Sequence, residues 1–217
     1  MKKSNFFATV IMLLSASVMQ LSAQSRQYLH EGWTFGEVRF PNRYPAQVPG
    51  VVHTDLLRLG LIDDPYIGLN ERKVQWVDKE DWVYETTFRA DETILADEHI
   101  DLCFDGLDTY ADVFLNGSKI LEADNMFRRW RISVTLLKAG DNVLRVYFHS
   151  PVKVDLPEWA KHPHLYQAAN DQSENGGLQD CKLSVFARKA GYHYGWDWGP
   201  RLVTSGIWRS VYLESWS

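Results

Sequence analysis

The chain has 217 residues, of which 45% are apolar and 24% charged, with a net charge of −5 at pH 7. This balance is that of an ordinary globular protein, and it excludes a disordered acidic tail, a collagen-like chain and a multi-span membrane protein. The acidic charge argues against a nucleic-acid partner, because phosphate binding requires a basic surface. Aromatic residues are numerous, with 9 Trp, 10 Tyr and 10 Phe, and such rings pack in cores or against apolar ligand faces.

Residues 1–23 have the order of a secretory signal peptide. Two lysines give a positive start, an apolar stretch follows, and small residues precede a cut predicted after Ala23. The apolar stretch is too short to span a membrane comfortably. We therefore expect a mature domain of residues 24–217 that is periplasmic or secreted, with no membrane attachment after cleavage. An uncleaved amphipathic helix is the alternative.

One short helix is expected near residues 54–59. Thr54 can cap it, Asp55 suits the positive helix start, leucines supply an apolar face, and Gly60 ends it.

From residue 82 onward, short runs alternate large apolar with polar residues. The predicted strands are residues 82–89, 100–105, 111–115, 118–121, 132–134, 143–148, 182–187 and 210–214. Asn116-Gly117 indicates a hairpin, because both residues tolerate a positive φ. Short strands separated by turns predict an all-β sandwich or barrel rather than βαβ units. Residues 151–180 are expected to form a long irregular segment. Loops of this length inside a compact domain tend to be functional or mobile.

Few residues fit a metal or redox site. Cys103 and Cys181 could form a disulfide in an oxidising compartment, but the sequence does not show whether they meet. They do not suggest zinc, because no Cys-x-x-Cys pair accompanies them. His162 and His164 lack a third ligand, so no metal site is expected there. Motifs of serine hydrolases, phosphate-binding loops and zinc proteases are absent from the sequence.

The densest motif is residues 192–201, Tyr-His-Tyr-Gly-Trp-Asp-Trp-Gly-Pro-Arg. One interpretation is a strand whose aromatic face fills the core. The other is that Asp197, flanked by Trp196 and Trp198, contacts a sugar. A carboxylate accepts hydrogen bonds from two hydroxyls, and an indole packs against the C–H face of the ring. The spacing alone does not decide between the two.

The motifs along the chain resemble the N-terminal sugar-binding domain of β-mannosidases in glycoside hydrolase family 2. The resemblance covers nearly the whole mature chain and depends on the order and spacing of many short motifs. These motifs are residues 48–50, 52–57, 64–66, 68–71, 81–84, 104–113, 116–117, 123–127, 192–201 and 206–209.

The resemblance implies a jelly-roll β-sandwich of the galactose-binding-like kind at the start of a longer retaining glycosidase. The two catalytic glutamates of such enzymes lie on a separate (β/α)₈ barrel, which the domain contacts. The resemblance also implies that Asp197 binds hydroxyls of a terminal β-mannosyl residue and that Trp196 shapes the pocket wall. Trp198 and Arg201 are expected to support them, by alternation of side-chain direction. No cofactor is implied.

The chain departs from the family because it lacks the barrel, so no catalytic residue is expected in it. Asn70-Glu71 superficially resembles the Asn-Glu pair that carries the acid/base in this enzyme clan, but it precedes the strands, and we expect a structural role. The chain alone is therefore expected to be inactive on β-mannosides. Two alternatives are a free-standing secreted carbohydrate-binding module and the same domain of a β-galactosidase or β-glucuronidase relative.

Overall fold

The structure is a computed structural model that describes residues 24–162, 164 and 166–217. The predicted signal peptide and the cut after Ala23 lie outside the described residues. Among the residues that it does describe, no helix combines the length and the apolar character that crossing a membrane requires.

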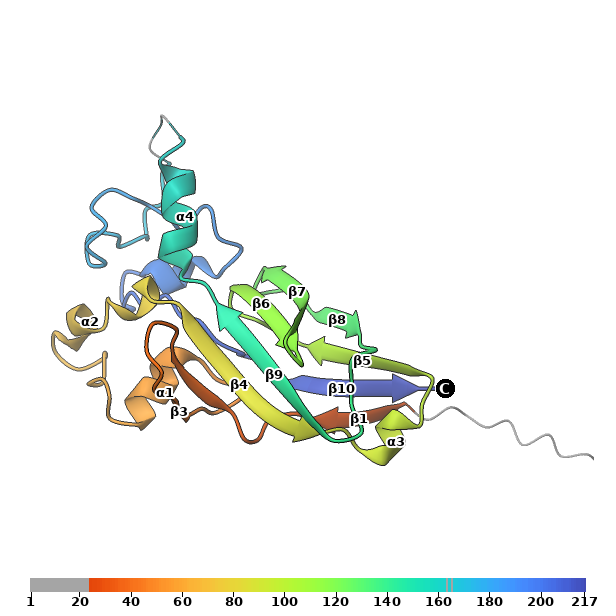
Figure 1. Cartoon of the computed structure of the whole chain (residues 1–217). Coiled ribbons are helices and arrows are strands. Elements are labelled where there is room, and N and C mark those ends of the chain that lie inside the picture. The colour runs from red at the N-terminus through yellow and green to blue at the C-terminus, as the bar shows by residue number, and fades with distance from the viewer. Residues whose placement is uncertain (1–23, 163, 165) are drawn as a thin grey trace, which may run out of the picture.

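Two antiparallel sheets form a β-sandwich (Figure 1). The four-stranded sheet has the order β1 (Ser25–Tyr28), β10 (Val211–Trp216), β5 (His99–Phe104) and β8 (Trp130–Ser133). The six-stranded sheet has the order β3 (Tyr44–Pro45), β2 (Thr34–Glu37), β4 (Trp82–Arg89), β9 (Asp141–Phe148), β6 (Tyr110–Leu115) and β7 (Ser118–Asp124). The predicted all-β sandwich is confirmed.

The alternation of side chains builds one core between the two sheets. In β9 the burial alternates residue by residue along most of the strand, because successive side chains of a strand point to opposite faces. Both sheets contribute side chains that are fully buried: Phe35, Tyr84, Leu102, Phe104, Val113, Leu115, Leu144, Val146, Phe148, Val211 and Leu213. The hairpin between β6 and β7 turns at Asn116 and Gly117, whose φ values of 52° and 87° confirm the predicted turn.

Four short α-helices and two 3-10 helices connect the described strands, where one helix was expected. They are α1 (Val52–Arg58), α2 (Asn70–Lys73), α3 (Glu92–Leu95), α4 (Pro151–Trp159), η1 (Val77–Lys79) and η2 (Gly191–Tyr194). The cap of α1 is Val51 rather than Thr54. The Thr54 hydroxyl instead donates to the Val51 carbonyl at 2.7 Å. Gly60, with a φ of 67°, follows the end of α1 as predicted.

Two sequence expectations were wrong. Residues 182–187 form no strand, because Leu183 is buried in a small separate cluster with Val152, Tyr194 and Val203 rather than in a sheet. The segment expected to be irregular begins with helix α4. That helix starts where Ser150 caps it, its hydroxyl accepting the Lys153 N–H at 3.1 Å, and Pro151 suits the first helical position.

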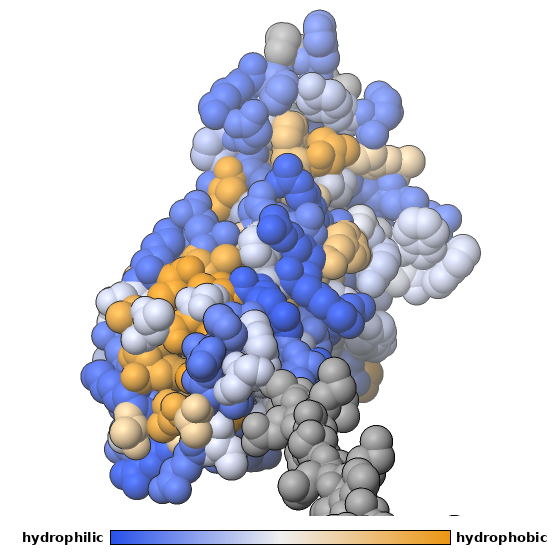
Figure 2. Space-filling view, turned by 90° about the vertical axis from the view of Figure 1, so that its right-hand side faces the viewer, coloured by the Kyte–Doolittle hydropathy of each residue, from blue (hydrophilic) through white to orange (hydrophobic). Residues whose placement is uncertain are grey.

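The two ends of the sandwich differ. Helices α2 and α4 and the long loops lie at one end, and the C-terminus and α3 lie at the other (Figure 1). Viewed from the C-terminal side, hydrophilic residues cover most of the upper surface, and hydrophobic residues gather in a patch on its lower left (Figure 2). The irregular segments that could form a site are therefore concentrated at the end carrying α2 and α4.

Two neighbours on β9 test the inward and outward faces. Leu144 is fully buried, whereas Val143 is 38% exposed. We expect Leu144→Ala to lower the free energy of unfolding by about 2–5 kcal/mol, because it removes apolar contacts and leaves a cavity. Val143→Ala should cost less than about 1 kcal/mol. Urea unfolding measures both, and equal losses would contradict this assignment of faces.

Candidate functional site

The residues predicted to meet a sugar lie on an exposed turn rather than on a strand. The segment of residues 192–201 starts within η2 and then turns at residues 196–199, where the Trp196 N–H donates to the Gly199 carbonyl at 3.3 Å. The interpretation as a core strand was therefore wrong. Trp196 is 39% exposed and Trp198 83% exposed, and Asp197 between them is also exposed.

An open groove of about 330 Å³ separates this turn from the loop that leads into α2. We call it the Trp-Asp groove. Its lining residues are Pro65, Tyr66, Gly68, Glu71, Gln172, Trp196, Asp197, Trp198, Gly199 and Pro200. The groove thus brings together two carboxylates, one amide and three aromatic rings. These are groups that accept hydrogen bonds from hydroxyls and pack against C–H faces.

Three groove residues that carry polar or aromatic groups, Tyr66, Glu71 and Gln172, were not proposed as sugar contacts from the sequence. Glu71 was expected to be structural, and its Oε1 does accept the Arg201 N–H at 2.9 Å, but its side chain also lines the groove. Gln172 lies in a polar stretch without periodicity, and Tyr66 follows a proline in a turn. Tyr66 and Glu71 fall within motifs that carry the family resemblance, but only the tertiary fold places all three residues opposite Trp196, so no local pattern could have assigned them to the groove.

Gln172 holds the N-terminal end of the turn in place. Its side-chain amide donates to the Trp196 carbonyl at 2.7 Å, and its backbone N–H donates to the Tyr194 carbonyl at 2.8 Å. Gly195 lies between these two contacts with a φ of 119°. A Cβ at Gly195 would approach the Gln172 side chain to 2.6 Å, so both the conformation and the close approach require glycine.

Arg201, which is buried, holds the C-terminal end of the turn in place. Its guanidinium NH1 donates to Asp78 at 2.6 Å and to Gln75 at 2.7 Å, and the residue is only 1% exposed. Gly176 allows this placement, because a Cβ there would approach the guanidinium carbon to 2.6 Å. Burial raises the pKa of Asp78 above its usual value although Arg201 opposes the rise. For the Asp78 carboxyl, the cost of dehydration therefore outweighs the attraction to Arg201.

A second polar cluster lies beneath η2. Lys189 is buried and donates to Asp108 and to the Thr204 carbonyl. The Thr204 hydroxyl donates to Asp108 at 2.5 Å, so it accepts from His193 Nδ1 at 2.8 Å. Burial, with a smaller contribution from Lys189, lowers the pKa of His193 to about 4 and that of buried His53 to about 3. Both imidazoles are therefore neutral at neutral pH.

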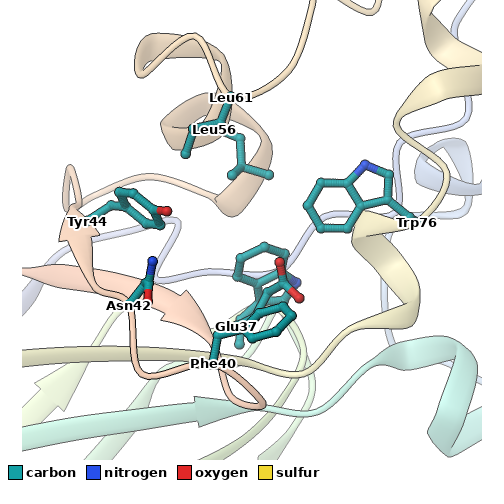
Figure 3. Close-up of a pocket in the computed structure, with 8 residues that line it drawn as sticks. Glu37, Phe40, Asn42, Tyr44, Leu56, Leu61 and Trp76 are labelled. Atoms are coloured by element: carbon teal, nitrogen blue, oxygen red, sulfur yellow. The ribbon is translucent and has the colours of Figure 1, made fainter.

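A further groove opens beside β2 and β3. This aromatic groove has a volume of about 400 Å³, and it is lined by Glu37, Phe40, Asn42, Tyr44, Leu56, Leu61, Trp76 and Trp82. Figure 3 shows Trp76 on one side of it and Tyr44 and Asn42 on the other. It shares no lining residue with the Trp-Asp groove.

The described residues contain no group of three or more His, Cys, Asp or Glu side chains that could hold a metal ion. Both cysteines are free thiols, Cys103 buried in β5 and Cys181 partly exposed in a loop. The question of a disulfide, open at the sequence level, is thus answered against a bridge in this structure.

The comparisons with known proteins identify the domain type. The model of the family described as "Glycosyl hydrolase 2 galactose-binding domain-like" matches residues 33–209. Curated relatives include "Beta-mannosidase B" of Emericella nidulans, 40% identical over 204 residues, which are 91% of this chain and 23% of that protein. "Beta-mannosidase B" of Thermothelomyces thermophilus is 43% identical over 190 residues, which are 86% of this chain and 21% of that protein. The chain thus spans less than a quarter of their length.

Comparison with solved structures supports the same domain type. The β-D-mannosidase of Dictyoglomus thermophilum matches with a TM-score of 0.80 and 43% identity, over 89% of this chain and 23% of that one. The exo-chitosanase of Amycolatopsis orientalis matches with a TM-score of 0.60 and 19% identity, over 89% of this chain and 21% of that one. The second likeness concerns the fold alone.

The Arg201–Asp78 pair leads to a prediction about stability. Arg201→Met should lower the free energy of unfolding by about 3–5 kcal/mol, because it leaves Asp78 buried without its cation. Adding Asp78→Asn should restore part of that loss, since no unpaired charge then remains at this position. Urea unfolding of the two single variants and the double variant measures the coupling. A single Arg201→Met variant within about 0.5 kcal/mol of the wild type would contradict this role.

The buried imidazoles predict acid sensitivity. A folded-state pKa of about 3 for His53 and about 4 for His193 lies below the unfolded value of about 6.5. The unfolded state therefore binds more protons as the pH falls, and stability decreases below about pH 6.5. Each imidazole should cost about 2 kcal/mol between pH 6.5 and 5, partly offset by Asp155, whose pKa burial raises to about 6. Urea unfolding at each pH should show a smaller decrease for His193→Gln; an unchanged pH slope would contradict the assignment.

Proposed function

We propose that this chain, which belongs to the glycosyl hydrolase 2 galactose-binding domain-like family, is the N-terminal domain of a β-mannosidase-type retaining glycosidase. Its part in the reaction is to supply one wall of the pocket for the terminal β-mannosyl residue. The observation that carries the proposal is the placement of Trp196 and Asp197, exposed side by side on a turn that is held by the Gln172 amide on one side and by the buried Arg201–Asp78 pair on the other.

In this proposal Asp197 accepts hydrogen bonds from two sugar hydroxyls, since a carboxylate has two oxygens and no donor. Trp196 presents its indole to the C–H face of the ring and shapes the wall beside Asp197. The Trp198 ring meets the Trp196 ring edge-on, with centroids 6.3 Å apart. Trp198 and Arg201 thus support the pair in different ways, the first at the surface and the second from the interior.

Catalysis itself is assigned to residues outside this chain. Retaining glycosidases use two carboxyl groups about 5 Å apart across the scissile bond. Glu71 and Asp197 line one groove, but Glu71 is held by the Arg201 backbone N–H, which suits positioning rather than proton transfer. The chain alone is therefore expected to be inactive, and its partner is the catalytic barrel of the same polypeptide.

Export is also part of the proposal. The charge and apolar pattern of residues 1–23 supports a cleaved signal peptide and a periplasmic or secreted enzyme. N-terminal sequencing of the protein recovered from its source cells tests this, and a sequence that begins at Met1 would contradict cleavage.

The decisive experiment begins with the DNA downstream of the Ser217 codon. An open frame of several hundred codons would permit expression of the longer enzyme and assay with 4-nitrophenyl β-mannoside, β-galactoside and β-glucuronide. We expect hydrolysis of the mannoside above all. Asp197→Asn should lower kcat/KM by about 100-fold, because it weakens two hydrogen bonds to a charged group. The matched control is Asp180→Asn, an exposed carboxylate outside the Trp-Asp groove, which should leave kcat/KM unchanged.

Other outcomes would contradict the proposal in distinct ways. A preference for galactoside or glucuronide would assign the domain to a relative with another specificity. A stop codon after Ser217, together with saturable binding of mannose by the chain, would indicate a free-standing carbohydrate-binding module. Turnover by the chain alone that is lost in Glu71→Gln would place catalysis within this domain.

A further inference from the structure

The aromatic groove has no part in the function proposed above, and its two sides differ in chemistry. Trp76 forms one side, and Tyr44 and Asn42 form the other, with Glu37 and Phe40 between them (Figure 3). One side therefore offers an indole surface, the other offers an amide and a phenol hydroxyl, and a carboxylate lies between them. Leu56 and Leu61 also line the groove.

The polar side has unused hydrogen-bonding capacity. Among the described residues, neither the Tyr44 hydroxyl nor the Asn42 side-chain amide has a hydrogen-bond partner. Glu37 uses its Oε2 to pair with Arg39 at 2.8 Å, and its Oε1 makes no contact of this kind within the described chain. These groups can both donate to and accept from a ligand.

The aromatic side is held in place before any ligand arrives. The Trp76 and Trp82 rings pack with centroids 6.0 Å apart, and Trp82 is almost fully buried, with its indole N–H bonded to the Val77 carbonyl at 2.9 Å. Phe40 adds a half-exposed ring at 49% exposure. A fixed aromatic surface reduces the ordering cost of binding.

We propose that the aromatic groove is a second saccharide-binding site, which takes one or two sugar rings of a manno-oligosaccharide. The identity of the sugar rests on the proposed function, whereas the site itself is separate from the Trp-Asp groove. A pyranose ring has a C–H face for Trp76 and hydroxyls around its rim for Tyr44, Asn42 and Glu37. The volume of about 400 Å³ falls within the range of small-ligand pockets.

The same polar groups argue against a purely apolar occupant. An aliphatic or aromatic side chain from another protein would dehydrate Tyr44, Asn42 and Glu37 without giving them partners, and unpaired buried polar groups oppose binding. Glu37 is the one charged residue among those lining the groove, and its charge is paired with Arg39, so no lining residue supplies an unpaired cation for a ligand carboxylate. A neutral polyhydroxylated ring satisfies both requirements.

The test is a titration of the chain with β-1,4-mannotetraose, followed by isothermal calorimetry. Phe40 and Asn42 are exposed, so Phe40→Ala and Asn42→Ala should leave the fold intact. We expect each variant to raise the Kd of this site about fivefold, because each removes one contact with the ligand. The matched control is Phe127→Ala, which removes a 61% exposed ring that follows β7, at the opposite edge of the sheet from β3. It should leave the Kd unchanged.

Asp197→Asn separates this inference from the proposed function. If mannotetraose fails to bind, or binds with a Kd that neither Phe40→Ala nor Asn42→Ala changes, the second site is wrong. In that case, loss of activity in the longer enzyme on Asp197→Asn would still support the proposed function. If Phe40→Ala and Asn42→Ala weaken binding while Asp197→Asn leaves the activity of the longer enzyme intact, the second site stands and the proposed role of Asp197 is wrong.

Discussion

The buried contact between Arg201 and Asp78 fixes the end of the sandwich on which the Trp-Asp groove is formed. Arg201 bonds through its guanidinium to Asp78 and Gln75, through its backbone N–H to Glu71, and through its carbonyl to Gln75. One residue therefore joins the segment around α2 and η1 to the turn that carries Asp197. Because the two walls of the groove belong to these two segments, their separation is set by buried hydrogen bonds rather than by free loops.

These buried contacts hold the two walls of the Trp-Asp groove in position, but they lower the stability of the fold. Burial raises the pKa of Asp78 and lowers that of Lys189, although each has an opposite charge beside it. Dehydration thus outweighs attraction for the Asp78 carboxyl and for the Lys189 ammonium, as is common for buried ions. The free energy that offsets this cost comes from the apolar core between the sheets, where Phe104 and Phe148 are fully buried. The apolar core of the sandwich thus offsets the cost of burying the polar groups that hold its irregular end in place.

The sequence predicted the parts of the fold that follow local rules. Strand β9 alternates between core and solvent along most of its eight residues, and this period is visible without a structure. Strands β4 and β5 were also predicted, but their burial runs over several consecutive residues instead of alternating. Strands β1, β2 and β3 have only two to four residues and were not predicted. Residues 182–187 alternate like a strand, but Leu183 packs into a separate cluster. Burial against non-sheet neighbours is a tertiary property that alternation cannot reveal.

The candidate site could be predicted only in its exposed half. Trp196 and Asp197 stand out as a motif. Glu71 and Gln172 join them from positions 126 and 25 residues before Asp197. The sequence marks Glu71 only as part of a pair with an expected structural role, and no local signal marks Gln172. The groove that results is open: Tyr66 is 75% exposed and Trp198 83% exposed. Pockets for small ligands bury most of the ligand surface, so a single wall of this kind binds a sugar weakly. Large exposed rings beside a carboxylate on a fixed turn are what one wall of a composite pocket requires, which supports the proposal that a second domain completes it.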